Sequence, residues 1–192
     1  MNREIDSVAS PNDPAIDLQS LFKVQYGMYV ITSFDDEKMN GQIVTTVMQV
    51  TNEPIKLTAC LSKETLTHDM VCKSRVFGIS VLDISTTMDL IGCFGFRSGR
   101  ECNKFEKVPY DVGVTGCPLL KEHTLTVIET RVTKIVDIVT HTLFIGDVVT
   151  SRQIKKGEAM TYEYYHKELK GRSPKNAPTY QVSKAVSHKS DE

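Results

Sequence analysis

The stretch that decides the fold is VQYGMYVITSF-DDEKMNG-QIVTTVMQV, residues 24–50. Residues 24–34 are rich in β-branched and aromatic side chains, which is typical of a strand. Residues 35–41 are polar and end in Asn-Gly, a strong hairpin signal. Residues 42–50 are predicted to form the return strand. The segment therefore predicts an antiparallel hairpin near the start of the domain.

Further strands and short helices are predicted along the rest of the chain. A short helix is expected over residues 64–73, with Ser62 as its cap, and another over residues 88–94. The strands show β-branched runs or alternation and cover residues 55–61, 75–84, 125–136 and 143–154. Because strands dominate and their connections are short, we expect a mainly β protein, an antiparallel barrel or sandwich rather than a doubly wound sheet.

Length and composition suit one domain with a real core. The chain has 192 residues, of which 40% are hydrophobic and 24% charged. We expect an N-terminal arm over residues 1–20, the folded domain over residues 21–170, and a partly disordered tail over residues 171–192, because both ends are polar and contain proline. The net charge is −1 and the cations are spread along the chain, so no nucleic acid partner is expected.

The chain also lacks the signals of membrane, secreted and zinc proteins. No apolar run approaches the roughly 20 residues that a bilayer span needs, and the first residues lack the apolar stretch of a signal peptide. We therefore expect a cytoplasmic protein without a membrane partner. The sequence has five cysteines, an odd number, and no CxxC motif. Both features argue against a disulfide framework and against a metal site.

Three segments place hydroxyl, amide or cationic side chains beside apolar runs. They are NGQIVTTVMQVT (residues 40–51), LSKETLTHD (61–69) and GFRSGRECNKF (95–105). Together they predict one polar, anion-tolerant site beside the β core, with a phosphorylated cofactor as the leading ligand. The dinucleotide-binding, Walker, hydrolase and zinc-protease motifs are absent from the sequence, so any dinucleotide chemistry would use a site without the Rossmann fingerprint.

Each of these groups has a purely structural interpretation as well. Strand residues such as Thr45, Thr46 and Gln49 either face solvent or line the polar edge of a flat heteroaromatic ring. Ser62 and Lys63 either begin a helix or place a phosphate at its N-terminus, where free amides and the helix dipole favour an anion.

The third segment and the histidines leave similar alternatives. Arg97, Ser98 and Lys104 belong either to a charged surface loop or to a second set of phosphate contacts. His141 stands just before the apolar strand LFIGDVV. A lone histidine at such a place is more often structural, and the functional alternative stays open.

Six segments taken in order resemble the flavin reductase-like family with the FMN-binding split barrel, especially its flavoredoxins and the flavin domains of high-molecular-weight rubredoxins. They are NGQIVTTVMQVT, SKETLTH, FGFRSGRECNKF, GVTGCPLL, HTLFIGDVV and MTYEYYHKELKGRSPKNAPTY, and they span about residues 18–180. The resemblance implies a six-stranded antiparallel Greek-key split barrel with short helices, usually a homodimer that binds FMN near the subunit interface.

The resemblance also implies a set of site residues. The flavin ring would lie against residues 45–49, and hydroxyl and cationic side chains would hold the ribityl phosphate. His141 matches a family position close to the flavin or nicotinamide, and it is expected to orient the hydride donor. Asn103 stands where the family often has Asp, which changes the charge of that loop. The implied cofactor-binding residues are Thr45, Thr46, Val47, Met48, Gln49, Ser62, Lys63, Thr67, Arg97, Ser98 and Lys104.

The resemblance predicts an enzyme, an FMN flavoprotein that passes electrons from NAD(P)H, a transient co-substrate, to flavin, ferric iron, oxygen or an iron protein. A first alternative is a flavoredoxin-type electron carrier that a redox partner protein reduces. A second alternative, from another class, is a dimeric split-barrel binding module without catalytic activity. Uptake of FMN and its reduction by a nicotinamide would separate the three.

Overall fold

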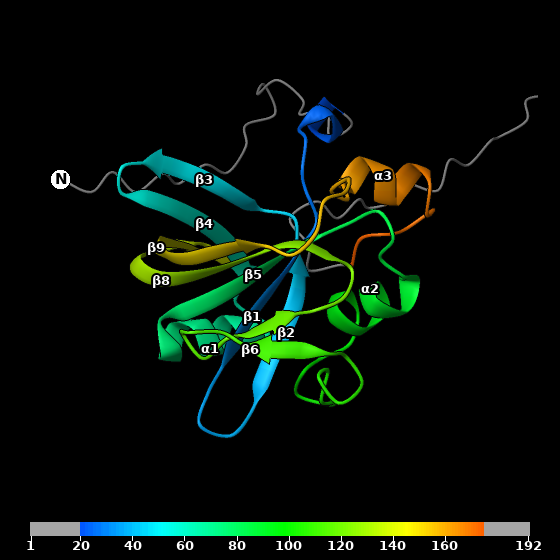
Figure 1. Cartoon of the computed structure of the whole chain (residues 1–192). Helices are drawn as coiled ribbons and strands as arrows, with labels where there is room; N and C mark the ends of the chain where they lie inside the picture. Colours follow the sequence, from blue (N-terminus) through cyan, green and yellow to red (C-terminus); the bar gives the residue numbers. More distant parts are fainter. Residues whose placement is uncertain (1–19, 175–192) are drawn as a thin grey trace, which may run out of the picture.

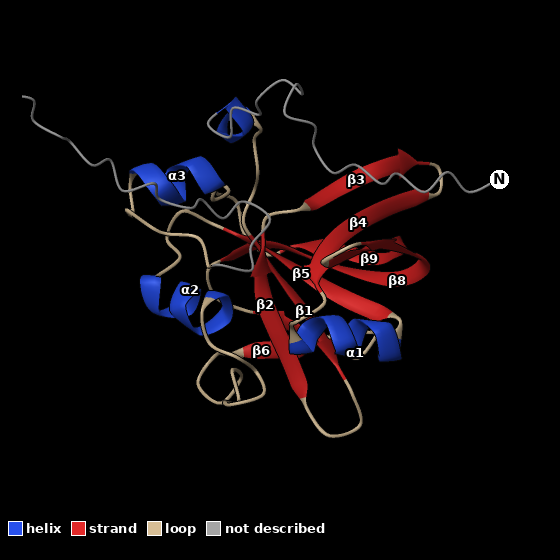
Figure 2. Ribbon diagram, turned by 180° about the vertical axis from the view of Figure 1, so that it is seen from behind, coloured by secondary structure: helices blue, strands red, loops and turns tan. Residues whose placement is uncertain are grey.

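A computed structural model describes residues 20–174 of the chain (Figures 1 and 2). The predicted N-terminal arm up to residue 19, and the predicted tail beyond residue 174, lie outside the described residues. The helices are the 3-10 helix η1 (Ser20–Lys23), α1 (Leu66–Ser74), α2 (Met88–Gly95) and α3 (Tyr162–Lys167). The strands are β1 (Tyr29–Phe34), β2 (Met39–Val44), β3 (Val47–Asn52), β4 (Ile55–Ser62), β5 (Val76–Leu82), β6 (Tyr110–Val112), β7 (Pro118–Leu120), β8 (Thr124–Ile138) and β9 (His141–Gln153).

Seven of these strands form one antiparallel sheet in the order β2-β1-β5-β8-β9-β4-β3, and β6 and β7 form a separate pair. The mainly β, antiparallel prediction is confirmed, although the main sheet has one strand more than the six expected. Helix α3 and the β6–β7 pair were not predicted from the sequence. Within residues 20–174, no helix combines the length and the apolar character that crossing a bilayer would require.

The first predicted hairpin is correct in kind and wrong in detail. The turn lies at Asp35–Lys38 rather than at Asn-Gly, because Asp35 Oδ1 accepts hydrogen bonds from the amides of Glu37 and Lys38, both at 3.0 Å. Asn40 and Gly41 therefore lie inside β2, paired with β1.

The predicted single return strand over residues 42–50 is also wrong. It is divided into β2 and β3, and Thr45 and Thr46 connect the two. Thr46 is fixed to β4, since its carbonyl accepts from Cys60 N at 3.2 Å and its hydroxyl donates to Cys60 O at 3.0 Å. The chain thus changes partner at this point, from β1 to β4.

This change of partner produces a split in the barrel. β2 and β3 are the two edge strands of the sheet order, although they follow each other in the chain. The sheet curls far enough for β2 to approach β4, yet no ladder among the described strands joins those two. Because β2 and β4 are not hydrogen-bonded to each other, residues of both strands line a cavity at the split.

Two hydrophobic clusters hold the sheet and helices together. One lies within the curled sheet beside α1 and includes Phe77 and Phe144, both 0% exposed. The other lies between the sheet and the side that carries α2 and α3, where Figure 2 shows both helices together, and it includes Phe94 and Tyr165. Fully burying one such side chain contributes about 1.5–3 kcal/mol, so both clusters fix the elements on either side of the split.

Candidate functional site

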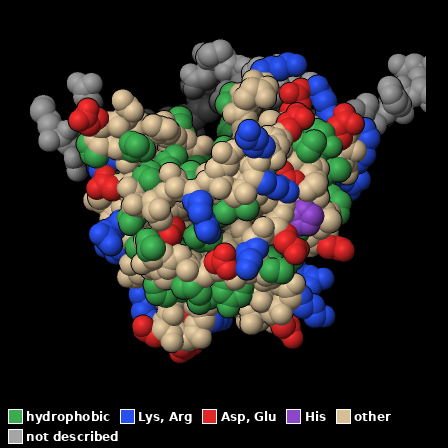
Figure 3. Space-filling view, viewed as in Figure 1, with side chains coloured by type: hydrophobic (Ala, Val, Ile, Leu, Met, Phe, Trp, Pro, Cys, Tyr) green, Lys and Arg blue, Asp and Glu red, His purple; other side chains and the backbone are tan. Residues whose placement is uncertain are grey.

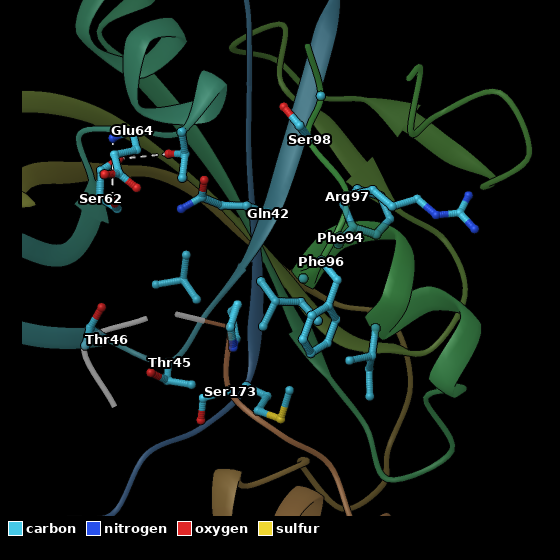
Figure 4. Close-up of a pocket in the computed structure, with 18 of the residues that line it drawn as sticks. Gln42, Thr45, Thr46, Ser62, Glu64, Phe94, Phe96, Arg97, Ser98 and Ser173 are labelled. Carbon is cyan, nitrogen blue, oxygen red and sulfur yellow. Dashed lines mark hydrogen bonds between the residues drawn. The ribbon is translucent and has the colours of Figure 1, made fainter. Parts of the chain in front are cut away.

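A cavity of about 310 Å³ opens at the split between β2 and β4. Its wall is formed by β2, the link to β3, the end of β4, the start of α1, the end of α2 with the loop that follows, and α3 with the segment after it. Figure 4 shows Ser62 and Glu64 on one side, Phe94 and Phe96 on the other, and Gln42 between them. The volume falls within the usual range for ligand pockets, roughly 300–1,000 Å³.

Two buried polar atoms on this wall, Gln42 Oε1 and His141 Nε2, have no hydrogen-bond partner among the described residues. The other ring nitrogen of His141, Nδ1, lies 2.8 Å from Thr140 Oγ1. A buried polar group without a partner costs about 1–3 kcal/mol. A ligand with complementary hydrogen-bonding groups would remove this cost, so both atoms indicate where a polar ligand edge would bind.

Lys104 brings a buried positive charge to the same wall. It is 4% exposed, and its Nζ donates to Gly41 O at 2.9 Å and to Phe94 O at 3.4 Å. It takes part in none of the ion pairs found among residues 20–174. Burial lowers the pKa of this ammonium to about 8. Since a buried cation without an anion is costly, the cavity favours an anionic ligand.

The connection from β4 to α1 brings hydroxyl groups and a helix terminus to the wall. Ser62 is the last residue of β4 and is 7% exposed. The prediction that Ser62 caps the helix is wrong, because α1 begins at Leu66 and Thr65 occupies the cap position. Thr65 Oγ1 accepts from His68 N at 3.3 Å. The positive end of the α1 dipole therefore lies beside the cavity, a favourable place for an anion.

The structure brings some of the predicted site residues together and leaves others outside the cavity. Those that line it are Thr45, Thr46, Ser62, Arg97, Ser98, Lys104 and His141. Those that do not line it are Val47, Met48, Gln49, Lys63 and Thr67. The roles of both groups stay predictions.

The contacts of the second group explain their positions. Lys63 Nζ donates to Asp137 at 2.6 Å, and this hydrogen bond holds the pKa of the Asp137 carboxyl below its usual value. Thr67 is fully buried, and its hydroxyl accepts from Asn40 Nδ2 at 2.9 Å. Thr67 therefore supports Asn40, which does line the cavity. Met48 lies farther along β3 and is 61% exposed.

The first group is not uniform either. Arg97 lines the cavity, but in Figure 4 its guanidinium extends away from Gln42. Cys60, which was not predicted to belong to the site, lies on the wall, and burial raises the pKa of its thiol. It is thus a neutral thiol. Of the cations predicted to hold a phosphate, Lys104 is the one that the fold buries at the cavity.

Sequence reasoning missed several residues of the wall. Gln42 had a usable signal, because it is a polar residue within an apolar strand, as Thr45 and Thr46 are. The tyrosines of α3 and the residue Arg172 had none, because α3 and the segment after it reach the cavity only through the tertiary fold. The missed residues include Asn40, Gln42, Phe94, Phe96, Tyr162, Tyr165 and Arg172.

Comparisons with known proteins agree with this fold. The family model of the flavin reductase like domain matches residues 21–172. The ferric-chelate reductase (NAD(P)H) of Archaeoglobus fulgidus is 43% identical over 169 residues, covering 88% of this chain and 100% of that protein. The high molecular weight rubredoxin of Moorella thermoacetica is 40% identical over 169 residues, covering 88% of this chain and 74% of that protein.

Among solved structures, the NADH:FAD oxidoreductase SgcE6 of Streptomyces globisporus superposes with a TM-score of 0.68 at 21% identity. The match covers 81% of this chain and 92% of that one. At this identity the likeness supports the fold alone.

Proposed function

From the premise that this chain belongs to the flavin reductase like family, we propose that its cavity binds FMN and that the protein passes electrons from NAD(P)H through FMN to an acceptor. The observation that carries the proposal is the meeting of three groups on the wall of one cavity. Within residues 20–174, the buried Lys104 ammonium has no anionic partner, and Gln42 Oε1 and His141 Nε2 have no hydrogen-bond partner. An anionic ligand with a polar edge would satisfy all three groups.

The residues present fit FMN. A flavin needs apolar surface for its ring, hydrogen-bonding groups for its polar edge and donors for its phosphate. Phe94 and Phe96 supply aromatic surface. Gln42 and His141 supply the unpartnered polar atoms. Lys104 supplies the buried positive charge.

When bound, FMN would accept a hydride from the nicotinamide and release electrons to the acceptor. Lys104 and the Ser62 hydroxyl, beside the start of α1, would hold the phosphate. Gln42 and the link at Thr45 and Thr46 would position the ring. His141 would orient the incoming nicotinamide through Nε2. These side chains bind, orient and exclude water, and none needs to act as a strong acid or base.

A ferric chelate is the leading candidate for the electron acceptor. The Archaeoglobus fulgidus relative is named a ferric-chelate reductase (NAD(P)H), and the match covers 100% of that protein and 88% of this chain. Free flavin and oxygen are further candidates, since a cavity that opens at the surface leaves a bound flavin reachable by small molecules.

The second candidate is an electron carrier that a protein partner reduces. It is favoured by the 40% identity to the high molecular weight rubredoxin of Moorella thermoacetica. In this case the electron partner of FMN would be a separate redox protein, and NAD(P)H would react poorly. The binding module without catalysis has no such support, because relatives along most of the chain are named as reductases.

We also propose a homodimer in the cytoplasm. The β3–β4 hairpin, which projects from the sheet in Figure 1, exposes Met48 by 61%, Val50 by 41% and Ile55 by 49%. A second copy packed on this hairpin would cover these side chains and lie close to the cavity at its base.

The five cysteines are all free, which is typical of a reducing compartment.

The test separates binding from reduction. FMN-free protein is titrated with FMN and followed by flavin fluorescence, and its sedimentation reports whether it is a dimer. The FMN-loaded protein is then mixed anaerobically with NADH or NADPH. Binding of one FMN per chain, followed by bleaching of the flavin absorbance, supports the reductase. Binding without bleaching leaves the carrier, and failure to bind FMN refutes both.

Two variants test the roles on the wall. Gln42→Leu should weaken FMN binding about 10-fold, the cost of one buried hydrogen bond of about 1.4 kcal/mol. Gln153→Leu, at the exposed end of β9, is the matched control and should bind FMN normally. His141→Ala should bind FMN with near-normal affinity but slow the anaerobic reduction. Equal reduction rates would assign His141 a structural role.

A further inference from the structure

Residues 171–174, the rim arm, follow α3 and lie on the rim of the cavity. Arg172, Ser173 and Pro174 are among the residues that line the cavity, as Thr45 is, and Figure 4 labels Ser173 and Thr45 among the lining residues. The roles proposed above for binding FMN do not use this segment. Its hydrogen bonds to α3 and the exposed side chain of Arg172 point to a role in binding.

The backbone of the rim arm turns back on α3 through two unusual residues. Lys170 adopts a left-handed conformation with φ 53°, which is uncommon for a residue other than glycine. Gly171 N then donates to Tyr165 O at 3.0 Å. Gly171 lies so close to the Tyr165 ring that an added Cβ would stand 2.0 Å from Cζ. A side chain at position 171 would therefore displace the arm.

Three side chains of α3 fix the rim arm by hydrogen bonds. The Tyr165 hydroxyl donates to Arg172 O at 2.9 Å and accepts from Arg172 N at 3.1 Å. His166 Nδ1 lies 2.8 Å from Gly171 O, and the Tyr162 hydroxyl is hydrogen-bonded to Ser173 Oγ. Both backbone groups of Arg172 are thus held by one buried tyrosine, so the position of this residue is preorganised.

The side chain of Arg172, by contrast, is exposed and has no acidic partner among the residues that the structure describes. None of the ion pairs among residues 20–174 includes it. A guanidinium binds phosphate and carboxylate groups through paired hydrogen bonds. The resident cofactor already has a buried cation in Lys104. An exposed arginine on a rigid rim is better suited to a molecule that enters and leaves.

We propose that the rim arm is a substrate-recognition element and that Arg172 binds an anionic group of the transient substrate. This inference rests on the proposed function. The anion would be a phosphate of the nicotinamide dinucleotide or a carboxylate of a ferric chelate, because both classes of molecule must approach the bound flavin. Arg172 is thus a specificity residue, and the arm positions it.

The test uses full-length, FMN-loaded Arg172→Gln. Its matched control is Lys156→Gln, which removes the same charge from an exposed residue that does not line the cavity. Binding of NADP⁺ and of NAD⁺ is measured by the perturbation of the flavin spectrum, and the KM for ferric citrate is measured separately. We expect Arg172→Gln to weaken one of these interactions by about 5- to 20-fold. The control should change none of them.

The two sources of the anion give different results. A loss confined to NADP⁺, or shared by NADP⁺ and NAD⁺, identifies the dinucleotide. A rise confined to the KM for ferric citrate identifies the chelate. High salt should reduce the difference between the wild-type protein and Arg172→Gln, because the contact is exposed. Gly171→Ala, which displaces the arm but keeps Arg172, should reproduce the same loss.

Other outcomes would overturn the inference. If Arg172→Gln weakens FMN binding more than about twofold, the arm belongs to the cofactor site. If the variant binds every ligand as the wild-type protein does, Arg172 recognises no anion. A wild-type protein that binds no FMN would instead refute the proposed function, and that result is visible before any variant is compared.

Discussion

Replacing Lys104 by methionine should change how the stability of the FMN-free protein depends on pH. Burial lowers the pKa of Lys104 from 10.5, the ordinary value, to about 8. Between these two pH values the unfolded chain keeps a proton that the folded chain has lost. Stability rises with pH wherever the unfolded state binds more protons, so the ammonium destabilises the fold below pH 8 and this cost disappears as the pH approaches 10.5.

The size of the effect follows from the shift. At about 1.36 kcal/mol per pKa unit, the wild-type protein should gain about 3 kcal/mol relative to Lys104→Met between pH 7 and about pH 10.5. Methionine also leaves Gly41 O and Phe94 O without their donor, which destabilises the variant. Because that loss hardly depends on pH in this range, it shifts the whole curve and leaves its slope unchanged.

Urea unfolding of both proteins, followed by circular dichroism at pH 7 and at about pH 10, measures the difference. Other groups that titrate in this range, such as buried tyrosines and cysteines, are present in both proteins and cancel in the comparison. A difference in unfolding free energy that stays constant within about 1 kcal/mol would refute the argument, because it would mean that the ammonium is solvated or already paired.

Two further variants test how the cavity wall and the β6–β7 region are supported. Gly99→Ala should destabilise the protein by about 1–3 kcal/mol and weaken FMN binding, because the added Cβ would lie 2.1 Å from Asn40 Oδ1. Gly95→Ala is the control, because the atom nearest to its added Cβ lies 3.7 Å away. Equal thermal unfolding temperatures of the two variants would contradict the packing argument. Glu129→Gln should lower the free energy of unfolding by about 2–4 kcal/mol. The buried carboxylate accepts hydrogen bonds from Val114 N at 3.0 Å, Thr115 N at 2.7 Å and the Thr115 hydroxyl at 2.5 Å, and the amide of glutamine would turn a donor toward these donors. Urea unfolding measures this loss, and a change below about 0.5 kcal/mol would show that the network is dispensable.

The fold class could be predicted because alternation and β-branched runs act locally. The strands β5, β8 and β9 and the helix α2 lie close to their predicted positions. The errors occur where a distant contact outweighs the local signal. Thr46 breaks the return strand because it bonds to Cys60, and Thr65 replaces Ser62 as the helix cap because Ser62 remains in β4. Neither partner choice is visible in a local pattern.

The predicted site residues only partly coincide with the cavity wall, and their roles stay predictions. The sequence pointed to hydroxyl and cationic side chains near the strand ends, and several of them do line the cavity. It did not distinguish Lys63, which pairs with Asp137 at the surface, from Lys104, which the fold buries beside Gly41. A lysine has a long, flexible stem, so its environment depends on which elements pack around it.

The amino-acid order alone determined that this chain is an antiparallel β protein of the flavin reductase type, because strand periodicity and a series of short motifs are written along one dimension. Tertiary structure alone decided where the sheet fails to close, which cation is withdrawn from water, and that the segment after α3 reaches the cavity rim. Those properties depend on contacts between residues far apart in the chain, such as Lys104 with Gly41, and burial and electrostatic cost exist only once such contacts have formed.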